Sequence, residues 1–398
     1  MSAYQDQNDN NILKIIEGST HLFVPTRSMS EKNPPRSPAF FNPMAKISRD
    51  ISVLIYNAFT YSHKEEYEFA DVMSGVGARG LRVAKEVNQV KKVYINDLNS
   101  KAIEIAKRSA KINRISKKCK FSSEDYCLFL GKHSAPKARF DIIDLDPFGS
   151  PAQYIDSALR SIKDQGLISV TATDTAVLCG VHPKVSLRKY GGKSIRCEYS
   201  HELAIRLILG SIARSSMKID AGITPLFVHN TRHYVRVFIS FQTGVPMADE
   251  NLGSLGNIAH CRMCGYREWT DINVKCPNCD NNLVIAGPLW IGRIFSKNFL
   301  KTVKAYLGTT KAFSDNICRW IDGAEAECDL PPTYYVVDTV SDRLNIMSPS
   351  PSKVVTNLIQ SGFKASRTIL NFKGVRTNAS IKDFEKAIIE VNSVCKST

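Results

Sequence analysis

Two hydrophobic patterns alternate along the first two thirds of the chain. Short runs rich in Val, Ile and Phe alternate with segments in which apolar residues recur every three or four positions, the pattern of strands followed by amphipathic helices. The expected strands span 68–73, 92–96, 120–122, 140–145 and 166–173, and the expected helices span 79–87, 100–113, 151–162 and 199–216. This alternation predicts a parallel sheet covered by helices on both faces.

Two more β-rich segments, 222–229 and 234–241, are separated by only four residues. Such a short link requires the two strands to be antiparallel. The prediction is therefore an α/β fold with a seven-stranded, Rossmann-like sheet that ends in an antiparallel hairpin. Because the composition changes after Pro246, we expect an N-terminal domain of residues 1–245 and a smaller α+β domain of residues 246–398.

A further helix is expected to begin at Pro43. Asn42 suits the N-cap, and proline suits the first helical position. Apolar residues at helical spacing then predict one buried stripe, formed by Met44, Ile47, Ile51, Leu54, Ile55 and Ala58. Arg49 falls on the opposite face of this helix, where most cations are solvated.

The charge balance indicates a polyanionic partner. The 398 residues predict two to three domains, and 53 Lys and Arg against 38 Asp and Glu give a formal net charge of +15. A surplus of this size favours nucleic acid. No apolar run of about 18 residues and no signal-peptide pattern occurs, so we expect a cytoplasmic location and no membrane contact. No obligate protein partner is evident.

Two basic runs are candidates for nucleic-acid contact. Residues 101–120 contain eight Lys and Arg and one acidic residue, Glu104. The second run lies between Asp342 and Asp383 and contains Lys353, Lys364, Arg367, Lys373 and Arg376. Either run can be a solvated face. The second is the preferred candidate.

A glycine-rich turn follows the first predicted strand. Gly75, Gly77 and Gly80 match G-x-G-x-x-G between a strand and a helix, where glycine allows a tight turn and close approach of a ligand. Asp97 ends the next strand, where a carboxylate can bind both hydroxyls of an adenosine ribose. This arrangement suits NAD and S-adenosylmethionine alike.

Acidic residues around this turn distinguish the two cofactors. Asp71, at the end of the first strand, suits an ammonium and a sulfonium better than a pyrophosphate. Asp125 and Tyr126, after the third strand, provide an acceptor where an adenine amine would lie. A pyrophosphate would be repelled, so the pattern favours S-adenosylmethionine.

The sharpest motif is Asp146-Pro147-Phe148-Gly149, at the end of the fourth strand. Ligands bind beyond the carboxyl ends of such strands. Asp146 and the Pro147 carbonyl can accept hydrogen bonds from an exocyclic amine of a nucleobase, which exposes the nitrogen lone pair for methylation. Phe148 can stack on the base, an interaction of about 1–3 kcal/mol. The alternative is an ordinary turn that ends a strand.

Two CxxC pairs predict a metal site within residues 261–279. Cys261, Cys264, Cys276 and Cys279 have the spacing of a four-thiolate zinc site, which is structural because no coordination position is left for water. The alternative is a remnant without metal. The other cysteines are expected to fill the core, namely Cys119, Cys127, Cys179, Cys197, Cys318, Cys328 and Cys395.

Together these motifs resemble those of a known family. The segments at 40–50, 74–80, 96–97, 144–151 and 370–379 resemble the archaeal-type tRNA (guanine(26)-N(2))-dimethyltransferases, and the likeness extends from about residue 20 to the C-terminus. It implies a class I methyltransferase domain that transfers two methyl groups in turn from S-adenosylmethionine to guanine N2 of tRNA. It also implies a C-terminal domain that holds the tRNA.

The resemblance assigns roles by position. Arg49 and Arg79 would contact the cofactor, Asp97 its ribose, and Asp125 with Tyr126 its adenine. Phe40 and Phe148 would sandwich the flipped guanine, while Asp146 and Pro147 hold its amine. This chain has Phe40-Phe41 where family members often have Phe-Tyr.

Other functions are compatible with parts of the pattern. The acid-Pro-aromatic motif alone also permits an adenine-N6 or an rRNA guanine-N2 methyltransferase. A different class would be a zinc-containing RNA-binding protein without activity, or a nicotinamide enzyme. The intact Asp146-Pro147-Phe148 motif and the acidic pocket argue against both members of that class.

Overall fold

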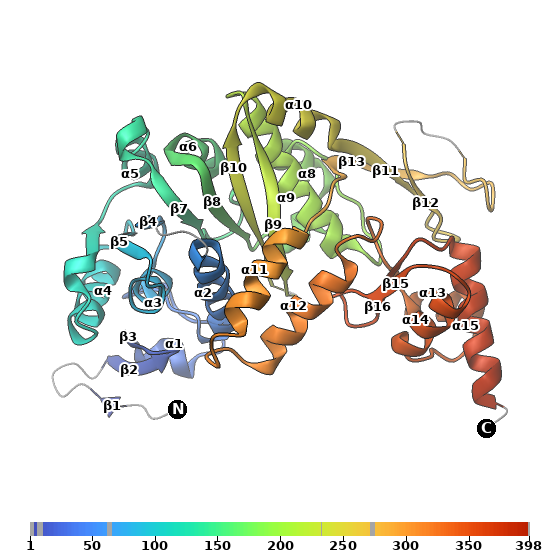
Figure 1. Cartoon of the computed structure of the whole chain (residues 1–398), viewed down its shortest axis with the longest axis horizontal. Coiled ribbons are helices and arrows are strands. Elements are labelled where there is room, and N and C mark those ends of the chain that lie inside the picture. The colour runs from blue at the N-terminus through green and yellow to red at the C-terminus, as the bar shows by residue number, and fades with distance from the viewer. Residues whose placement is uncertain (1–3, 6–10, 62–65, 232, 271–274, 397–398) are drawn as a thin grey trace.

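The computed structural model describes residues 4–5, 11–61, 66–231, 233–270 and 275–396, with side chains described from residue 11 to residue 393. Its largest element is a seven-stranded sheet, with the helices and small sheet formed by residues 335–396 at one end of the molecule (Figure 1). The strand order is β6-β5-β4-β7-β8-β10-β9. The strands are β4 (Tyr67–Asp71), β5 (Val90–Asn96), β6 (Cys119–Ser122), β7 (Phe140–Leu145), β8 (Ile162–Ala172), β9 (Ala221–Asn230) and β10 (Val235–Thr243).

The sheet confirms the predicted fold class. Strands β4 to β8 are parallel, and β10 is antiparallel to both β8 and β9. The connecting helices are α3 (Ala78–Glu86), α4 (Ser100–Ile112), α5 (Tyr126–Lys132), α6 (Ile155–Ser161), α7 (Thr175–Leu178), α8 (Pro183–Tyr190) and α9 (Ser200–Met217). The expected helix 151–162 ends at Ser161, because the chain enters β8 there.

Residues before the sheet form a hairpin that the hydrophobic pattern did not predict. Strands β2 (Ile12–Glu17) and β3 (Thr20–Pro25) pair antiparallel and lead into α1 (Thr26–Ser30). β3 packs against α3 and α4. A two-stranded hairpin is marginal alone, so its stability depends on these distant helices.

Helix α2 (Lys46–Tyr61) is not buried along one stripe as predicted. It follows a 3₁₀ turn, η1 (Pro43–Ala45), where the Asn42 side chain accepts a hydrogen bond from Met44 N at 2.9 Å. Met44 is 83% exposed, because it lies in this turn. The helix itself is buried on nearly all sides, since α3 packs on it from one direction and α11 (Lys297–Leu307) from another.

The C-terminal third contains two small sheets and several helices, as expected for the smaller α+β part. Sheet β12-β11-β13 contains β11 (Leu255–His260), β12 (Arg267–Trp269) and β13 (Val284–Trp290), and sheet β14-β16-β15 contains β14 (Tyr335–Val336), β15 (Ala365–Arg367) and β16 (Gly374–Thr377). The helices are α10 (Val245–Gly253), α11, α12 (Asp315–Glu327), α13 (Val337–Leu344), α14 (Pro351–Gln360) and α15 (Ile381–Lys396). The main apolar core runs from Ile12 to Leu370 and crosses residue 245, so the domain boundary stays a prediction.

Two expectations about single residues are wrong. Arg376 is 2% exposed and pairs with Glu202 and Glu327, so it does not belong to a surface basic run. Cys127 is exposed on the first turn of α5 and does not fill the core. Of the other cysteines outside the CxxC pairs, Cys119 and Cys328 are buried, and the side chain of Cys395 lies outside the described residues.

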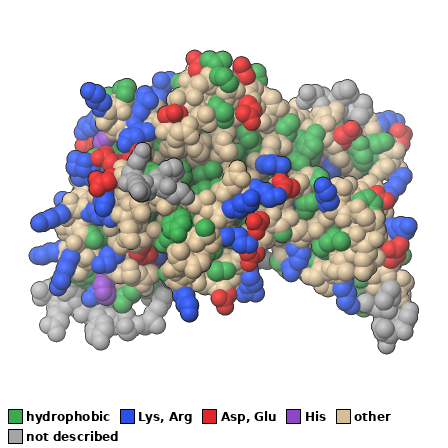
Figure 2. Space-filling model, in the orientation of Figure 1, with side chains coloured by type: hydrophobic (Ala, Val, Ile, Leu, Met, Phe, Trp, Pro, Cys, Tyr) green, Lys and Arg blue, Asp and Glu red, His purple; other side chains and the backbone are tan. Residues whose placement is uncertain are grey.

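The first basic run lies on the surface. Lys and Arg side chains project along the edge that α4 forms at the left of the view (Figure 2). Within the described residues, no helix combines the length and the apolar character needed to cross a membrane.

Candidate active site

The glycine-rich turn connects β4 to α3 and requires glycine at two positions. Gly75 and Gly77 have φ values of 53° and 73°, in the region that side chains disfavour. A Cβ on Gly75 would also lie 2.8 Å from the Phe40 carbonyl oxygen. The turn therefore brings the segment before α2 directly over the carboxyl end of β4.

Asp97, directly after the neighbouring strand β5, stabilises this turn through hydrogen bonds. Its Oδ2 accepts a hydrogen bond from Gly75 N at 2.7 Å, and its Oδ1 accepts one from Asn99 N at 2.9 Å. Burial raises the pKa of Asp97, although these two hydrogen bonds oppose the shift. The side chain remains partly exposed. It is held at the place where the sequence predicted a ribose ligand.

Asp71 is a buried carboxyl at the end of β4. Its Oδ2 accepts a hydrogen bond from Gly80 N at 2.9 Å, at the start of α3. Burial, together with the nearby charge of Asp144, raises the pKa of Asp71 to about 8. An unliganded Asp71 is therefore mostly protonated at neutral pH, and a cation beside it would favour the ionised form.

Replacement of Asp71 by asparagine is expected to change the pH dependence of stability. An aspartate ionises near pH 4 in the unfolded chain, and Asp71 ionises near pH 8 in the fold. Between these values only the folded state keeps the proton, so Asp71 makes the wild type less stable as pH rises. The stability of Asp71→Asn relative to wild type should rise by roughly 1 kcal/mol per pH unit in this window.

Denaturant unfolding of both proteins at pH 5, 6.5 and 8, without cofactor, measures this difference. The matched control is Asp125→Asn, because Asp125 is exposed. A difference between Asp71→Asn and wild type that does not change with pH would contradict the assignment.

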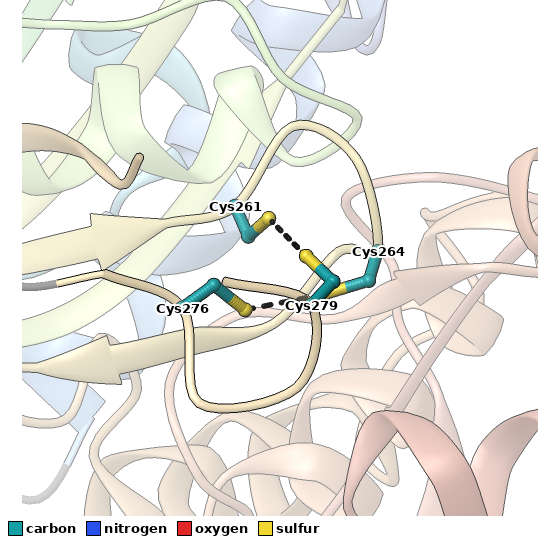
Figure 3. A group of neighbouring side chains, drawn as sticks. All are labelled: Cys261, Cys264, Cys276 and Cys279. Carbon is teal, nitrogen blue, oxygen red and sulfur yellow. Dashed lines mark hydrogen bonds between the residues drawn. The ribbon is translucent and has the colours of Figure 1, made fainter. Parts of the chain in front are cut away.

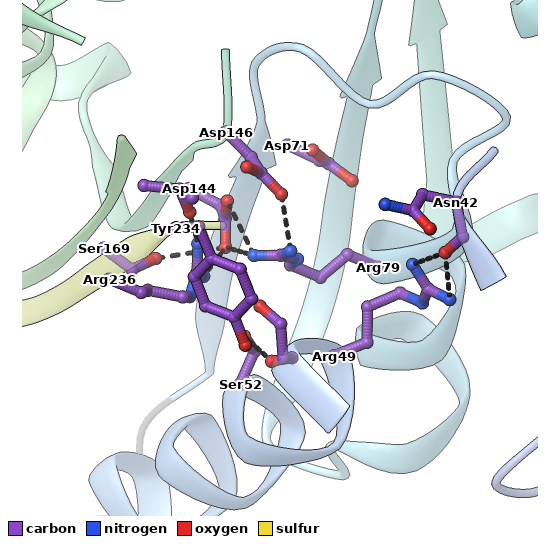
Figure 4. A network of polar contacts seen from close by, with 12 residues as sticks. Asn42, Arg49, Ser52, Asp71, Arg79, Asp144, Asp146, Ser169, Tyr234 and Arg236 are labelled. Atoms are coloured by element: carbon purple, nitrogen blue, oxygen red, sulfur yellow. Dashed lines mark hydrogen bonds and ion pairs between the residues drawn. The ribbon is translucent and has the colours of Figure 1, made fainter. Parts of the chain in front are cut away.

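The acid-Pro-aromatic motif follows β7 and is held by an arginine from α3. Arg79 Nη2 lies 2.6 Å from Asp146 Oδ2, and Arg79 Nη1 lies 3.1 Å from Asp144 Oδ2 (Figure 4). The Asp146 side chain is 33% exposed, whereas Arg79 and Asp144 are buried. One carboxylate oxygen of Asp146 is thus engaged by Arg79, and Oδ1 makes no contact with this arginine.

Beneath Asp146 lies a polar network that the sequence pattern did not reveal. Asp144 is fully buried and accepts hydrogen bonds from Arg236, Tyr56 and Ser169 (Figure 4). Burial alone would raise the pKa of Asp144, but the charges of Arg236 and Arg79 lower it to about 2. The network therefore keeps an ionised carboxylate beneath the motif.

The members of this network come from α2, β7, β8 and β10. Arg236 stands in a strand whose other residues are mostly apolar, so the sequence reads simply as a buried strand. The sequence did offer one signal for this network, namely a single arginine within a mostly apolar strand. An arginine that is buried in a sheet requires a buried acidic partner.

Arg49 is buried rather than solvated. Its guanidinium lies 2.6 Å and 2.7 Å from the two carboxylate oxygens of Glu17 in β2, and it donates to the Asn42 carbonyl oxygen at 3.1 Å. The expected solvent-facing position is wrong because the unpredicted hairpin covers this face of α2. Contact between Arg49 and a cofactor stays a prediction.

Two aromatic rings meet above the motif. The rings of Phe40 and Phe148 are 4.6 Å apart at an angle of 78°, and the Arg36 guanidinium lies 4.3 Å from the centre of the Phe148 ring. Phe148 is 52% exposed, whereas Phe41 is 2% exposed and packs in the core. Phe40 is thus the phenylalanine of this pair that borders the motif. A base can enter between the two rings only after one of them moves.

The residues expected to bind adenine lie beyond β6. Asp125 is exposed and caps α5, where its Oδ1 accepts a hydrogen bond from Cys127 N at 2.8 Å. The Tyr126 ring contacts the Tyr154 ring, with centroids 4.4 Å apart. Their contact with a cofactor stays a prediction, but both residues follow the strand next to β5, as the sequence predicted.

The four CxxC cysteines come together in the β11–β13 region. Their sulfur atoms all lie within 4.8 Å of one another, with 3.4 Å between Cys261 and Cys279 and between Cys264 and Cys276 (Figure 3). A tetrahedral zinc with Zn–S bonds of about 2.3 Å places sulfurs about 3.8 Å apart. Hydrogen bonds from Asn281 lower the pKa of Cys279 to about 6, which favours the thiolate. These four residues can therefore hold a structural zinc ion.

Zinc removal is expected to destabilise this region. Among the described residues of this region, those buried in its own apolar core are Ala259, Cys261, Cys276 and Leu283, too few to replace a metal. Cys276→Ser should bind less zinc and lower the unfolding temperature by roughly 5 °C or more, which corresponds to a loss of a few kcal/mol. Metal analysis and thermal unfolding test this, with exposed Cys127→Ser as the control. Wild-type protein that contains no zinc would contradict the site.

The fold and the site define the class of protein. A seven-stranded sheet with a terminal antiparallel hairpin, a glycine turn after β4 and acidic residues at the ends of successive strands identify a class I S-adenosylmethionine-dependent methyltransferase fold. A model of the N2,N2-dimethylguanosine tRNA methyltransferase family matches residues 18–389. The chain belongs to this family.

Individual relatives agree with this family. The chain is 33% identical over 383 residues to the tRNA (guanine(26)-N(2))-dimethyltransferase of Methanosphaera stadtmanae, covering 95% of this chain and 96% of the relative. It is 34% identical over 395 residues to the enzyme of the same name from Methanosarcina mazei, covering 95% and 98%. The family resemblance seen in the sequence is thereby confirmed.

A solved relative extends the agreement to three dimensions. The structure of Trm1 from Pyrococcus horikoshii, determined in complex with S-adenosyl-L-methionine, superposes with a TM-score of 0.81 at 28% identity. The match covers 94% of this chain and 99% of that one, so both the sheet and the C-terminal part share its fold.

Proposed function

We propose that this chain transfers two methyl groups in turn from S-adenosylmethionine to N2 of guanine 26 in tRNA. The observation that carries the proposal is the position of Asp146-Pro147-Phe148 at the end of β7, next to the glycine turn and beside an aromatic ring from the segment before α2. Membership of the family and the positive net charge of +15 support tRNA as the substrate.

The residues at the strand ends fit the methyl donor. Asp71 is a buried carboxyl with a raised pKa, and a positively charged ligand beside it would lower that pKa. Gly75 and Gly77 form the tight turn after β4, and Asp97 lies where a ribose would bind. By resemblance, Arg49, Arg79, Asp125 and Tyr126 complete the set. When bound, S-adenosylmethionine supplies an electrophilic methyl group on a sulfonium.

The target base has to leave the tRNA stack to reach this site. Flipping a base out costs a few kcal/mol and requires a slot that receives it. Phe40 and Phe148 are proposed to form that slot, with one ring on each face of the guanine. Arg36 lies against Phe148, so a small displacement of this exposed ring and cation would open the slot.

Asp146 and the Pro147 carbonyl are proposed to hold the N2 amine. An ordinary carboxylate with a pKa of about 3.9 cannot remove a proton from a neutral amine. The nitrogen becomes cationic as the methyl bond forms, and its proton then passes readily to Asp146. Because Arg79 binds Oδ2 of Asp146, its Oδ1 is the proposed acceptor. Alignment of the amine with the methyl group supplies much of the acceleration.

The experiment that tests this function is nucleoside mass spectrometry. Unmodified tRNA treated with the protein and S-adenosylmethionine should accumulate first methylguanosine and then dimethylguanosine. A tRNA with adenine at position 26 is the control and should remain unmodified. Methyladenosine, or product only with ribosomal RNA, would replace the proposal with one of the alternative methyltransferases. As part of the proposal, the protein acts in the cytoplasm, where tRNA is processed.

A further inference from the structure

The segment that follows β8 carries an unusual charge pattern. Residues 175–197 contain no Asp or Glu but five cations, which are Lys184, Arg188, Lys189, Lys193 and Arg196. All five side chains are exposed. Two exposed apolar side chains accompany them, Val181 at 47%, just before Lys184, and Leu187 at 51%, between Lys184 and Arg188. We refer to residues 181–196 as the α8 basic segment.

These five cations are not neutralised within the chain. No acidic side chain of the described residues lies within ion-pair distance of any of them. In contrast, several exposed lysines elsewhere have partners, such as Lys132 with Glu124 and Lys297 with Asp329. A helix whose charge serves only solubility commonly mixes both signs. The α8 basic segment therefore carries a local positive potential without compensation.

The end of helix α8 is held close to the methyl-transfer motif. Gly149 N donates to Thr173 Oγ1 at 2.7 Å, and Thr173 N donates to Gly149 O at 2.9 Å. Tyr190, the last residue of α8, donates to Asp174 Oδ1 at 2.7 Å. The end of α8 is thus held at Asp174, the residue after Thr173, beside the loop that presents Phe148.

The residues that follow α8 are attached to the C-terminal part. The backbone groups of Lys193 and Gly287 exchange two hydrogen bonds of 2.8 Å. Arg214 of α9 donates to the carbonyl oxygens of Tyr190 and Pro288. The segment is therefore fixed between the catalytic loop and strand β13, and its exposed cations keep a defined position relative to the target-base slot.

We propose that the α8 basic segment binds phosphates of the tRNA strand next to the flipped guanine. Phosphate contacts determine the register of a nucleic acid on a protein. The hydrogen bonds of Tyr190 to Asp174 and of Lys193 to β13 hold this segment in a fixed position suited to that role. The two apolar side chains can pack against sugar or base. This inference rests on the proposed function, since it names how the same site receives its substrate.

The basic run of α4 is the natural comparison. It carries six exposed cations, but Glu104 lies among them, and α4 packs against β3, β6 and α3. If net charge alone attracted tRNA, both surfaces would contribute equally. Because the α8 basic segment is held next to the target-base slot, it is predicted to contribute more to tRNA affinity than the basic run of α4.

Binding of unmodified tRNA at several salt concentrations tests the proposal. The variant Lys184→Gln/Arg188→Gln/Lys189→Gln should weaken binding at least tenfold and reduce the slope of log Kd against log salt by about 2 to 3. The control Lys107→Gln/Lys111→Gln/Lys117→Gln removes the same charge from exposed positions at α4 and should change Kd less than threefold. Equal losses in both variants, or none in the first, would overturn the proposal.

Two further measurements keep the outcomes separate. Unchanged S-adenosylmethionine affinity shows that each variant is folded, and the single charge reversal Arg188→Glu repeats the test with a smaller change. Wild-type protein that binds tRNA but forms no dimethylguanosine would refute the proposed function, while the Kd values still decide the role of α8. Normal methylation by the wild type, with unaltered tRNA binding by the α8 variants, would refute only the phosphate site.

Discussion

Replacement of Asp146 by alanine is expected to reduce the rate of methyl transfer about 10²–10⁴-fold, the range for loss of a positioned proton acceptor. The variant loses the carboxylate that is proposed both to orient the amine and to take its proton. It should keep S-adenosylmethionine affinity within a few fold, because Asp71 and Asp97 are unchanged. Single-turnover methylation of tRNA and equilibrium binding of the cofactor measure the two effects separately.

Two comparisons make this prediction specific. Asp146→Asn keeps one oxygen acceptor but cannot take a proton, so its rate should lie between those of wild type and Asp146→Ala. Asp156→Ala removes an exposed carboxylate from α6 and should leave the rate unchanged. A rate for Asp146→Ala close to that of the wild type would show that another group holds the amine.

Arg376→Met is expected to lower the free energy of unfolding by about 3–5 kcal/mol, the usual penalty for breaking a buried ion pair. Arg376 Nη2 lies 2.8 Å from Glu202 Oε2 in α9, and its Nε lies 2.7 Å from Glu327 Oε2 at the end of α12. The substitution leaves Glu327 without this cation and Glu202 with Arg206 alone. Equilibrium denaturation measures the loss.

The deficit of Arg376→Met should depend on pH. Burial opposes ionisation of Glu202, but Arg376 and Arg206 lower its pKa to about 2. A carboxylate with a lowered pKa contributes stability above its unfolded pKa of about 4.3. The deficit should therefore shrink as pH falls from about 4 toward 2. The pKa of Glu327, raised by burial, adds no stability of this kind.

The matched control is Arg367→Met. Arg367 is exposed nearby in β15, so its replacement should change stability by less than about 0.5 kcal/mol. Equal destabilisation by both substitutions would contradict a special role for the buried arginine. Arg367 remains in the basic run expected to contact tRNA, and its loss should weaken tRNA binding instead.

The local sequence predicted much of the site because strand ends are marked by nearby residues. Asp71, Asp97 and Asp146 each follow an apolar run, and parallel strands bring their carboxyl ends to one edge of a sheet. The glycine turn and the CxxC spacing are likewise short-range patterns. Such features need only the chain within about 20 residues, so the sequence identified them without knowledge of the packing.

The buried ion pairs, in contrast, depend on contacts between residues that are far apart in the sequence. Arg49 has its partner 32 residues away in Glu17, Arg79 has its partner 67 residues away in Asp146, and Arg376 has its partner 174 residues away in Glu202. A charged residue on a helix or strand has the same local pattern whether it faces water or a buried partner. For this reason the expectation that Arg49 faces solvent was wrong, and so was the expectation that Arg376 belongs to a basic surface.

The sequence by itself determined the seven strands of the main sheet in chain order, the Asp146-Pro147-Phe148 motif and the four zinc-ligand candidates. Only the tertiary structure decided that Arg236 keeps Asp144 ionised beneath the motif, that Phe40 borders Phe148, and that the end of α8 is bonded to Asp174 while Lys193, after it, is bonded to β13. The physical reason is that hydrophobic periodicity reports which face of an element is buried, whereas charge pairing depends on which distant element covers that face.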